Sequence, residues 1–234
     1  MLEVRDLNAW YGRSHILQGV SLSVGAGEAV CVIGRNGAGK TTTLRSIMGL
    51  VARRGGQVVF DGREILSEPT HRRFIYGLAY VPEERRIVPG LTVQENLRLG
   101  LVASPNRARE AEVIDRIAET FPRLKERLSQ AADTLSGGEQ QMLAIARAMV
   151  AEPKLIMLDE PSEGIMPVLV DEMFELFARM KGQGITLLIV EQNVERALQL
   201  ADRAYVMDQG VIVHEGDAKA LLADQDIQER YCSV

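Results

Sequence analysis

The segment from Gly34 to Thr41 reads Gly-Arg-Asn-Gly-Ala-Gly-Lys-Thr and matches the pattern G-x-x-x-x-G-K-[ST] at every fixed position. Glycines let consecutive backbone N–H groups turn toward a polyphosphate, and a helix after the loop adds the partial positive charge of its N-terminus. The Lys40 ammonium would bind the β- and γ-phosphate oxygens, and the Thr41 hydroxyl would bind Mg²⁺. The segment predicts a nucleotide site formed by Gly34, Asn36, Gly37, Ala38, Gly39, Lys40, Thr41 and Thr42.

Two adjacent acids, Asp159 and Glu160, follow the apolar segment 155–158. Ligands of α/β proteins bind at the carboxyl ends of strands, and neighbouring strand residues point to opposite sides, so the two acids should have different roles. We expect Asp159 to hold Mg²⁺, directly or through water, and Glu160 to orient or deprotonate the attacking water. A charged turn before Pro161 is the alternative, and the phosphate loop in the same expected sheet disfavours it.

A third segment reads Leu-Ser-Gly-Gly-Glu at 135–139. Ser136 and Glu139 have the S-x-x-E spacing of a capping box, which would open a helix over 140–151. A capping box does not require Gly137 and Gly138, which weaken a helix start, whereas close approach of the backbone to a ligand does. The segment therefore predicts a second phosphate-binding helix N-terminus.

The elements that must position these residues alternate in character. The first 65 residues are typical of strands and turns: Ala29–Ile33 is continuously apolar, as in a buried parallel strand, and Asp61-Gly62 predicts a hairpin turn. Residues 93–151 are typical of helices. Strand, helix and strand over 155–158, 167–181 and 185–190 predict a parallel sheet, and 205–213 a hairpin. We expect one α/β domain over 1–234, with a nucleotide-binding core (1–92 and 152–234) and an inserted helical lobe (93–151).

Composition excludes several classes of function. The net charge of −5 is not the basic footprint of a nucleic-acid-binding protein. The two cysteines, Cys31 and Cys232, and the three scattered histidines indicate neither a zinc site nor a disulfide scaffold. The apolar runs are far shorter than the roughly 18 residues of a membrane helix. The N-terminus lacks the apolar region of a signal peptide. We therefore expect no nucleic-acid partner and no direct membrane insertion.

Together, the three segments resemble the ATP-binding subunits of ABC transporters, whose signature motif corresponds to LSGGEQQ at 135–141, and the resemblance covers essentially the whole chain. It implies a P-loop ATPase core with a mainly parallel sheet, an antiparallel β part and a helical lobe, and it implies ATP and Mg²⁺ as ligands. It also implies that two copies pair head to tail. The 136–139 segment of one copy would then cover the γ-phosphate held by Lys40 of the other.

Four positions bear on how well the family's pattern is kept. Tyr11 matches the aromatic residue that stacks on adenine, with a half-buried strand tyrosine as the alternative. Glu83 stands where a Gln is usual; a carboxylate can also bind Mg²⁺ but adds negative charge, and an exposed charged loop is the alternative. Gln192 stands where a His is usual, and its amide can donate to the γ-phosphate but cannot titrate. Gly164 replaces an Asp through which subunits communicate.

The segments VPEERR (81–86), VEQN (190–193) and GGEQQMLAIARA (137–148) resemble the LivF-like subunits of branched-chain amino acid importers. Urea and amide importers share much of this pattern. The resemblance implies an ATPase at the cytoplasmic face of the inner membrane that energises uptake. Integral membrane permeases would dock near 85–91, and a second ATP-binding subunit, identical or similar, would complete the site. A non-transport ABC ATPase is the competing hypothesis, disfavoured by the single phosphate loop. An inactive subunit conflicts with intact Lys40, Asp159 and Glu160.

Overall fold

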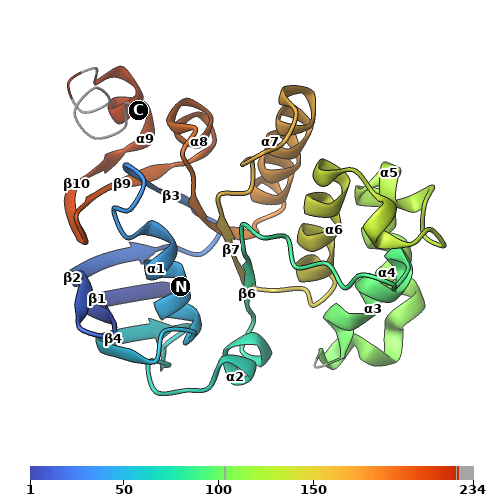
Figure 1. Cartoon of the computed structure of the whole chain (residues 1–234), viewed down its shortest axis with the longest axis horizontal. Coiled ribbons are helices and arrows are strands. Elements are labelled where there is room, and N and C mark those ends of the chain that lie inside the picture. Colours follow the sequence, from blue (N-terminus) through green and yellow to red (C-terminus); the bar gives the residue numbers. More distant parts are fainter. Residues whose placement is uncertain (103, 225, 227–234) are drawn as a thin grey trace.

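The computed structural model describes residues 1–102, 104–224 and 226, so Cys232 lies outside the described residues. Figure 1 shows an antiparallel sheet with β2, β1 and β4 beside a larger sheet, and β5 completes its order β2-β1-β4-β5. The antiparallel sheet comprises β1 (Leu2–Tyr11), β2 (Ser14–Val24), β4 (Arg53–Phe60) and β5 (Arg63–Glu64). The predicted turn at Asp61-Gly62 is confirmed: Asp61 and Gly62 both have positive φ, 51° and 76°, and join β4 to β5.

The larger sheet has six strands in the order β10-β9-β3-β8-β7-β6. Its strands are β3 (Ala29–Ile33), β6 (Leu78–Val81), β7 (Leu155–Asp159), β8 (Thr186–Val190), β9 (Arg203–Asp208) and β10 (Val211–Asp217). Neighbouring strands from β9 to β6 run parallel, and β10 pairs antiparallel with β9. The predicted mainly parallel sheet and the predicted hairpin over 205–213 are confirmed. The parallel arrangement places the carboxyl ends of β3, β6, β7 and β8 at one edge.

Helices cover the larger sheet and extend from one side of it. They are α1 (Lys40–Met48), α2 (Thr70–Ile75), α3 (Val93–Leu101), α4 (Glu110–Thr120), α5 (Pro122–Lys125), α6 (Gly137–Met149), α7 (Pro167–Gly182), α8 (Val194–Leu200) and α9 (Ala218–Ala223), with 3₁₀ turns at Pro105–Arg109 and Ala132–Thr134. In Figure 1, α3 to α6 lie together beyond β6. Over the described residues, no helix combines the length and apolar character needed to cross a bilayer.

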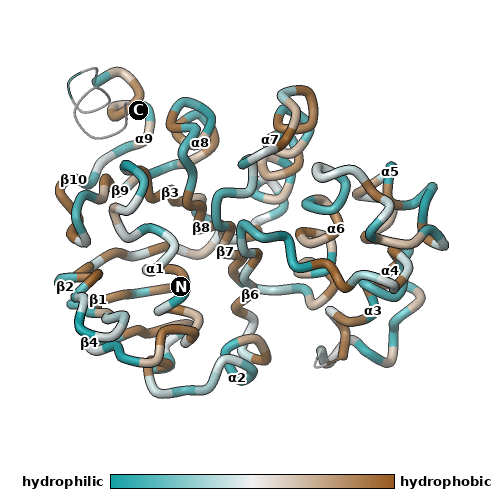
Figure 2. The backbone as a smooth tube through the Cα atoms, in the orientation of Figure 1, coloured by the Kyte–Doolittle hydropathy of each residue, from teal (hydrophilic) through white to brown (hydrophobic). Residues whose placement is uncertain are grey.

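The core has two layers because strand side chains alternate between the faces of the larger sheet. In β3, Val30 and Val32 pack with the antiparallel sheet and α1, whereas Ala29, Cys31 and Ile33 pack with the helices on the other face. Figure 2 shows hydrophobic positions concentrated along the strands. The second layer continues from the sheet into α3, α4 and α6. The division into a core and a lobe at 93–151 stays a prediction.

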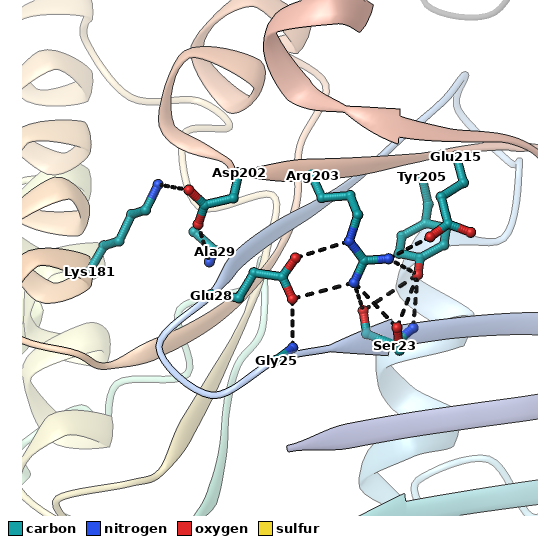
Figure 3. A network of polar contacts seen from close by, with 9 residues as sticks. All are labelled: Ser23, Gly25, Glu28, Ala29, Lys181, Asp202, Arg203, Tyr205 and Glu215. Atoms are coloured by element: carbon teal, nitrogen blue, oxygen red, sulfur yellow. Dashed lines mark hydrogen bonds and ion pairs between the residues drawn. The ribbon is translucent and has the colours of Figure 1, made fainter.

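A polar network links the two sheets (Figure 3). The Arg203 guanidinium, at the start of β9, donates to Glu28, Glu215 and the Ser23 carbonyl oxygen at the end of β2. The hydrogen bond to Glu28 is the main cause that raises the pKa of Arg203. Nearby, Asp202 accepts from Lys181 and from the Ala29 backbone N–H. These bonds pair partly buried and exposed polar groups where β2, β3 and β9 meet, and they connect one sheet to the other.

Arg73 of α2 is among the largest fully buried side chains of the described residues and holds α2 against α1. Among the described residues, its guanidinium donates to four backbone carbonyl oxygens: those of Ser46 and Ile47 near the end of α1, and those of Leu66 and Glu68 in the preceding loop. Burial lowers the pKa of Arg73 to about 10, so the group remains charged at neutral pH. Carbonyls at a helix C-terminus carry partial negative charge, which favours this cation.

We expect Arg73→Met to lower the free energy of unfolding by about 3 kcal/mol, because it leaves several buried carbonyl oxygens without donors. Urea unfolding measures the change. Arg72→Met is the matched control: Arg72 is exposed on the same helix and forms a 3.7 Å ion pair with Glu68, so its loss should cost less than about 1 kcal/mol. Equal effects of the two substitutions would contradict the assignment.

Candidate functional site

The predicted phosphate loop connects β3 to α1. Gly34 has φ 149°, and a Cβ on it would lie 2.1 Å from the Met207 carbonyl oxygen, so only glycine fits. Helix α1 begins at Lys40 with no acidic residue in its first turn. The Lys40 Nζ donates to the carbonyl oxygens of Gly34, at 2.9 Å, and of Arg35, at 3.3 Å. The loop thus encloses a buried ammonium beside a helix N-terminus, an arrangement that suits a polyphosphate.

Asp159 and Glu160 make different contacts, but not because they alternate along a strand: β7 ends at Asp159, and Glu160 follows it with φ 44°. The Asp159 Oδ1 accepts from the Thr41 hydroxyl at 2.8 Å, and its Oδ2 accepts from the Tyr80 hydroxyl at 2.8 Å. The Glu160 Oε1 lies 3.5 Å from the Lys40 Nζ, and its Oε2 accepts from the Gln192 amide. Asp159 is therefore directed to the threonine of the loop, and Glu160 to the lysine and to Gln192.

Burial raises the pKa of Asp159, while hydrogen bonds from Tyr80 and Thr41 act in the opposite direction. Glu83 follows β6, the neighbour of β7, and its side chain is exposed. Burial raises the pKa of Glu83, and the negative charges of Glu160 and Asp159 add to the effect. Glu83 therefore lies within electrostatic range of both acids, and a cation at this edge would favour the ionised form of all three.

The donor set around Thr41 fits Mg²⁺. Its hydroxyl and the Asp159 carboxylate are hard oxygen ligands 2.8 Å apart. Mg²⁺ is usually held by one or two protein oxygens together with waters and substrate phosphates. In the described part of the chain, no group of three or more His, Cys, Asp or Glu side chains forms a metal cluster. Phosphate oxygens or water would therefore have to supply the remaining ligands.

Tyr11, at the end of β1, is 47% exposed. It lines a cavity of about 270 Å³ together with Ile16, Gly37, Thr41 and Glu160. Its neighbour Trp10 packs instead, stacked on His15 at 4.5 Å and covered by Arg53. An accessible ring beside the phosphate loop is what base stacking requires, and the role of Tyr11 stays a prediction.

Ser136 is the exposed N-cap residue of α6. The predicted capping box is present: the Glu139 Oε2 accepts from the Ser136 N–H at 2.9 Å and from its hydroxyl at 2.6 Å, and Ser136 Oγ accepts from the Glu139 N–H at 3.4 Å. Helix α6 begins at Gly137, three residues before the expected start at 140, because an N-cap is followed directly by the first helical residue.

The two glycines of this segment also have neighbours within the chain. A Cβ on Gly138 would lie 2.4 Å from Leu169 of α7, and one on Gly137 would lie 2.8 Å from the Arg85 guanidinium. The absence of side chains therefore permits close packing of α6, a reason that sequence analysis missed. That these glycines also admit a ligand stays a prediction.

The structure gathers Tyr11, Lys40, Thr41, Asp159, Glu160 and Gln192 at one edge of the larger sheet. Among the described residues that line the cavity at Tyr11, none belongs to 136–139. Sequence analysis missed Tyr80, because a tyrosine in an apolar strand carries no signal until the strand order places β6 beside β7. It also missed Glu191, a buried carboxylate next to Gln192.

Comparisons with known proteins identify the family of this chain and several relatives. The sequence matches the family model described as ABC transporter over residues 17–163. It is 42% identical to the high-affinity branched-chain amino acid transport ATP-binding protein BraG of Pseudomonas aeruginosa, over 99% of each chain. It is 37% identical to the probable branched-chain amino acid transport ATP-binding protein LivF of Archaeoglobus fulgidus, covering 98% of this chain and 97% of that protein.

Two further comparisons widen the range of relatives. The chain is 35% identical to the lipopolysaccharide export system ATP-binding protein LptB of Haemophilus influenzae, covering 99% of this chain and 96% of that protein. The solved ADP conformation of an ATP-binding cassette of an ABC transporter superposes with a TM-score of 0.82 at 29% identity, covering 98% of this chain and 97% of that one.

Proposed function

Because this chain belongs to the ABC transporter family and is an ATP-binding, ATP-hydrolysing subunit of that family, we propose that it energises the import of branched-chain amino acids. The observation that carries the proposal is the 42% identity to BraG over 99% of both chains. LivF supports the same solute class, whereas LptB, at 35% identity, belongs to an export system. The solute therefore has to be tested directly.

In the proposed mechanism, each side chain at the sheet edge has one task. The loop amides and Lys40 bind the β- and γ-phosphates, and Tyr11 stacks on the adenine. Thr41 and Asp159, together with Glu83, would hold Mg²⁺, which when bound would offset the phosphate charge. Glu160 accepts the proton of the attacking water or orients that water, and the Gln192 amide, bonded to Glu160, also reaches the γ-phosphate.

A second copy, or a similar ATP-binding subunit, completes the proposed site. Ser136 is exposed at the N-terminus of α6 and is not among the residues that line the cavity at Tyr11. In a head-to-tail pair, it would approach the γ-phosphate held by Lys40 of the neighbouring copy. ATP would then hold the two subunits together, and hydrolysis would release them, which is a population shift driven by a ligand at an interface.

The proposed docking surface for the membrane permeases is a groove of about 320 Å³ between α1, α2 and β6 on one side and α3 and α6 on the other. Apolar side chains at Leu50, Ile75, Leu99 and Val102 are exposed around this region. The groove reaches Pro82, and of its described lining residues none lies in 85–91, the segment expected from sequence. We propose that docking of the permeases in this groove holds the subunit at the cytoplasmic face of the inner membrane.

Solute uptake tests the proposed function. In the source organism with this gene deleted, we expect uptake of labelled leucine, isoleucine and valine to fall and to return with the wild-type gene. Complementation with Lys40→Met should fail, because that chain lacks the phosphate-binding ammonium. If the deletion abolishes urea or amide uptake and leaves leucine uptake normal, the chain belongs to a urea or amide importer instead. Unchanged uptake together with a lipopolysaccharide defect would replace import by export.

Gln192→His is expected to introduce an inflection between about pH 6 and 7 in the pH profile of ATP hydrolysis, because an imidazole titrates near pH 6.5 and an amide does not. The wild-type profile should lack that inflection. Steady-state ATPase rates from pH 5.5 to 8.5 give the profiles of the wild type and of Gln192→His. Identical profiles for the two proteins would contradict the proposed position of Gln192 at the γ-phosphate.

A further inference from the structure

Glu191 is a buried carboxylate between the two loops that carry Glu160 and Gln192. It directly follows β8 and is 1% exposed. Its Oε1 accepts from the Ser162 N–H at 2.9 Å, and its Oε2 accepts from the N–H groups of Gln192, at 3.0 Å, and Asn193, at 3.1 Å. Among the described residues, no lysine or arginine forms an ion pair with it. Its charge is therefore balanced by backbone dipoles from both loops.

The turn that Glu191 holds is strained. Glu160 has φ 44°, a left-handed conformation that non-glycine residues rarely adopt and that costs about 1–3 kcal/mol. The Glu160 N–H donates to the Val190 carbonyl oxygen at 2.8 Å, and the Glu163 N–H donates to the Glu160 carbonyl oxygen at 3.2 Å. Such a conformation persists only where surrounding contacts impose it. The bond from Ser162 to Glu191 anchors the far side of the same turn.

We propose that Glu191 is a positioning residue for ATP hydrolysis: its carboxylate joins the Glu160 turn to the Gln192 loop and thereby sets the contact between those two side chains. The inference rests on the roles proposed above for Glu160 and Gln192. The hydrogen bonds of the Glu191 oxygens come from the backbone N–H groups of the two loops, so the role proposed for it is to hold those loops. It acts through geometry, and displacement of a catalytic group by about 1 Å can cost 10²-fold in rate.

The chemistry of the carboxylate is essential to this role. An ionised carboxylate accepts on both oxygens, whereas the amide of Gln has the same shape but accepts on only one. In Glu191→Gln, an NH₂ group would face at least one backbone N–H, so one loop would lose its anchor. Glu191→Asp keeps the charge and both acceptor oxygens on a shorter side chain. We therefore expect the rate of ATP hydrolysis to be highest in the wild type, lower in Glu191→Asp and lowest in Glu191→Gln.

The test compares kcat, ATP affinity and amide exchange in Glu191→Gln and Glu191→Asp. We expect Glu191→Gln to lower kcat by about 10- to 100-fold with the Kd for ATP changed less than about 3-fold, because the phosphate loop is untouched. Hydrogen exchange should speed up in peptides covering 160–165 and 190–194. Glu195→Gln, an exposed acid in α8, is the matched control and should leave kcat, Kd and exchange unchanged.

Two results would overturn the inference. One is a kcat for folded Glu191→Gln within about 3-fold of wild type; the other is a parallel loss of kcat and ATP affinity, which indicates a general structural role. If Glu191→Gln does not fold, the kcat, ATP affinity and hydrogen exchange of Glu191→Asp test the positioning role of Glu191 instead. The rate loss in Glu191→Gln combined with Gln192→Ala should be smaller than the product of the single losses, because both act on one contact.

Glu160→Gln separates this inference from the proposed function. If that substitution leaves turnover unchanged, the proposed role of Glu160 fails, and with it the premise for Glu191. If it abolishes turnover while Glu191→Gln does not lower kcat, only the positioning role of Glu191 fails.

Discussion

Glu160→Gln is expected to lower the rate of ATP hydrolysis by about 10²- to 10³-fold while ATP binding is retained. The amide has the shape of the carboxylate and can still contact Gln192, but it cannot accept a proton from water. The lysine and the loop amides that bind the phosphates are unchanged. ATP should therefore remain bound between two subunits, and ATP-dependent dimers should accumulate. Single-turnover hydrolysis and light scattering with Mg²⁺ and ATP measure the two effects.

Glu163→Gln provides the control, because Glu163 is an exposed carboxylate in the same turn. It changes the local charge by the same amount and should leave turnover close to wild type. Unchanged turnover in Glu160→Gln would favour the inactive-subunit hypothesis. Lost turnover without any ATP-dependent dimer would argue against ATP as the link between subunits.

Mixing two inactive variants is expected to restore activity if each site is built from two chains. Lys40→Met removes the phosphate-binding ammonium. Ser136→Asp keeps an accepted N-cap residue but places a negative charge at the proposed γ-phosphate contact. In a head-to-tail pair of one Lys40→Met and one Ser136→Asp chain, one site carries both substitutions and the other carries neither. Random pairing in an equal mixture should recover about a quarter of wild-type turnover.

The measurement requires two affinity tags, so that mixed dimers can be isolated and assayed separately from each parent. Two differently tagged Lys40→Met chains are the control and should remain inactive in every combination. Mixed dimers that contain Lys40→Met and Ser136→Asp and yet hydrolyse no ATP would refute the shared site. The signature segment would then act, if at all, on the nucleotide of its own chain.

The parts of the site that could be predicted are those whose chemistry lies in consecutive residues. The phosphate loop needs a strand, glycines, a lysine and a helix in direct succession, so its turn is specified locally. The capping box of Ser136 and Glu139 spans one helical turn, and the structure contains it. Asp159 ends the apolar strand β7 and Glu160 follows it, so the sequence predicted two acids at a strand end. Their different partners depend on the left-handed turn at Glu160, which the sequence did not predict.

Contacts between distant segments could not be predicted in the same way. Tyr80 reaches Asp159 only because β6 lies beside β7, and Gly138 packs on Leu169 only because α6 lies against α7. The role proposed for Gln192 came from family resemblance, and nothing local in the sequence indicates that its amide bonds to Glu160. Hydrophobic periodicity specifies which face of an element is buried but not which element covers it.

By itself, the sequence determined the type of chemistry: a polyphosphate loop, two acids at a strand end and a serine-capped helix, each encoded within a few residues. Tertiary structure alone decided how these parts meet. It brought Gln192 to Glu160, tied both loops to the Glu191 carboxylate, and left Ser136 exposed and outside the lining of the cavity at Tyr11. The physical reason is that such contacts depend on strand order and helix packing, which are set by the whole core.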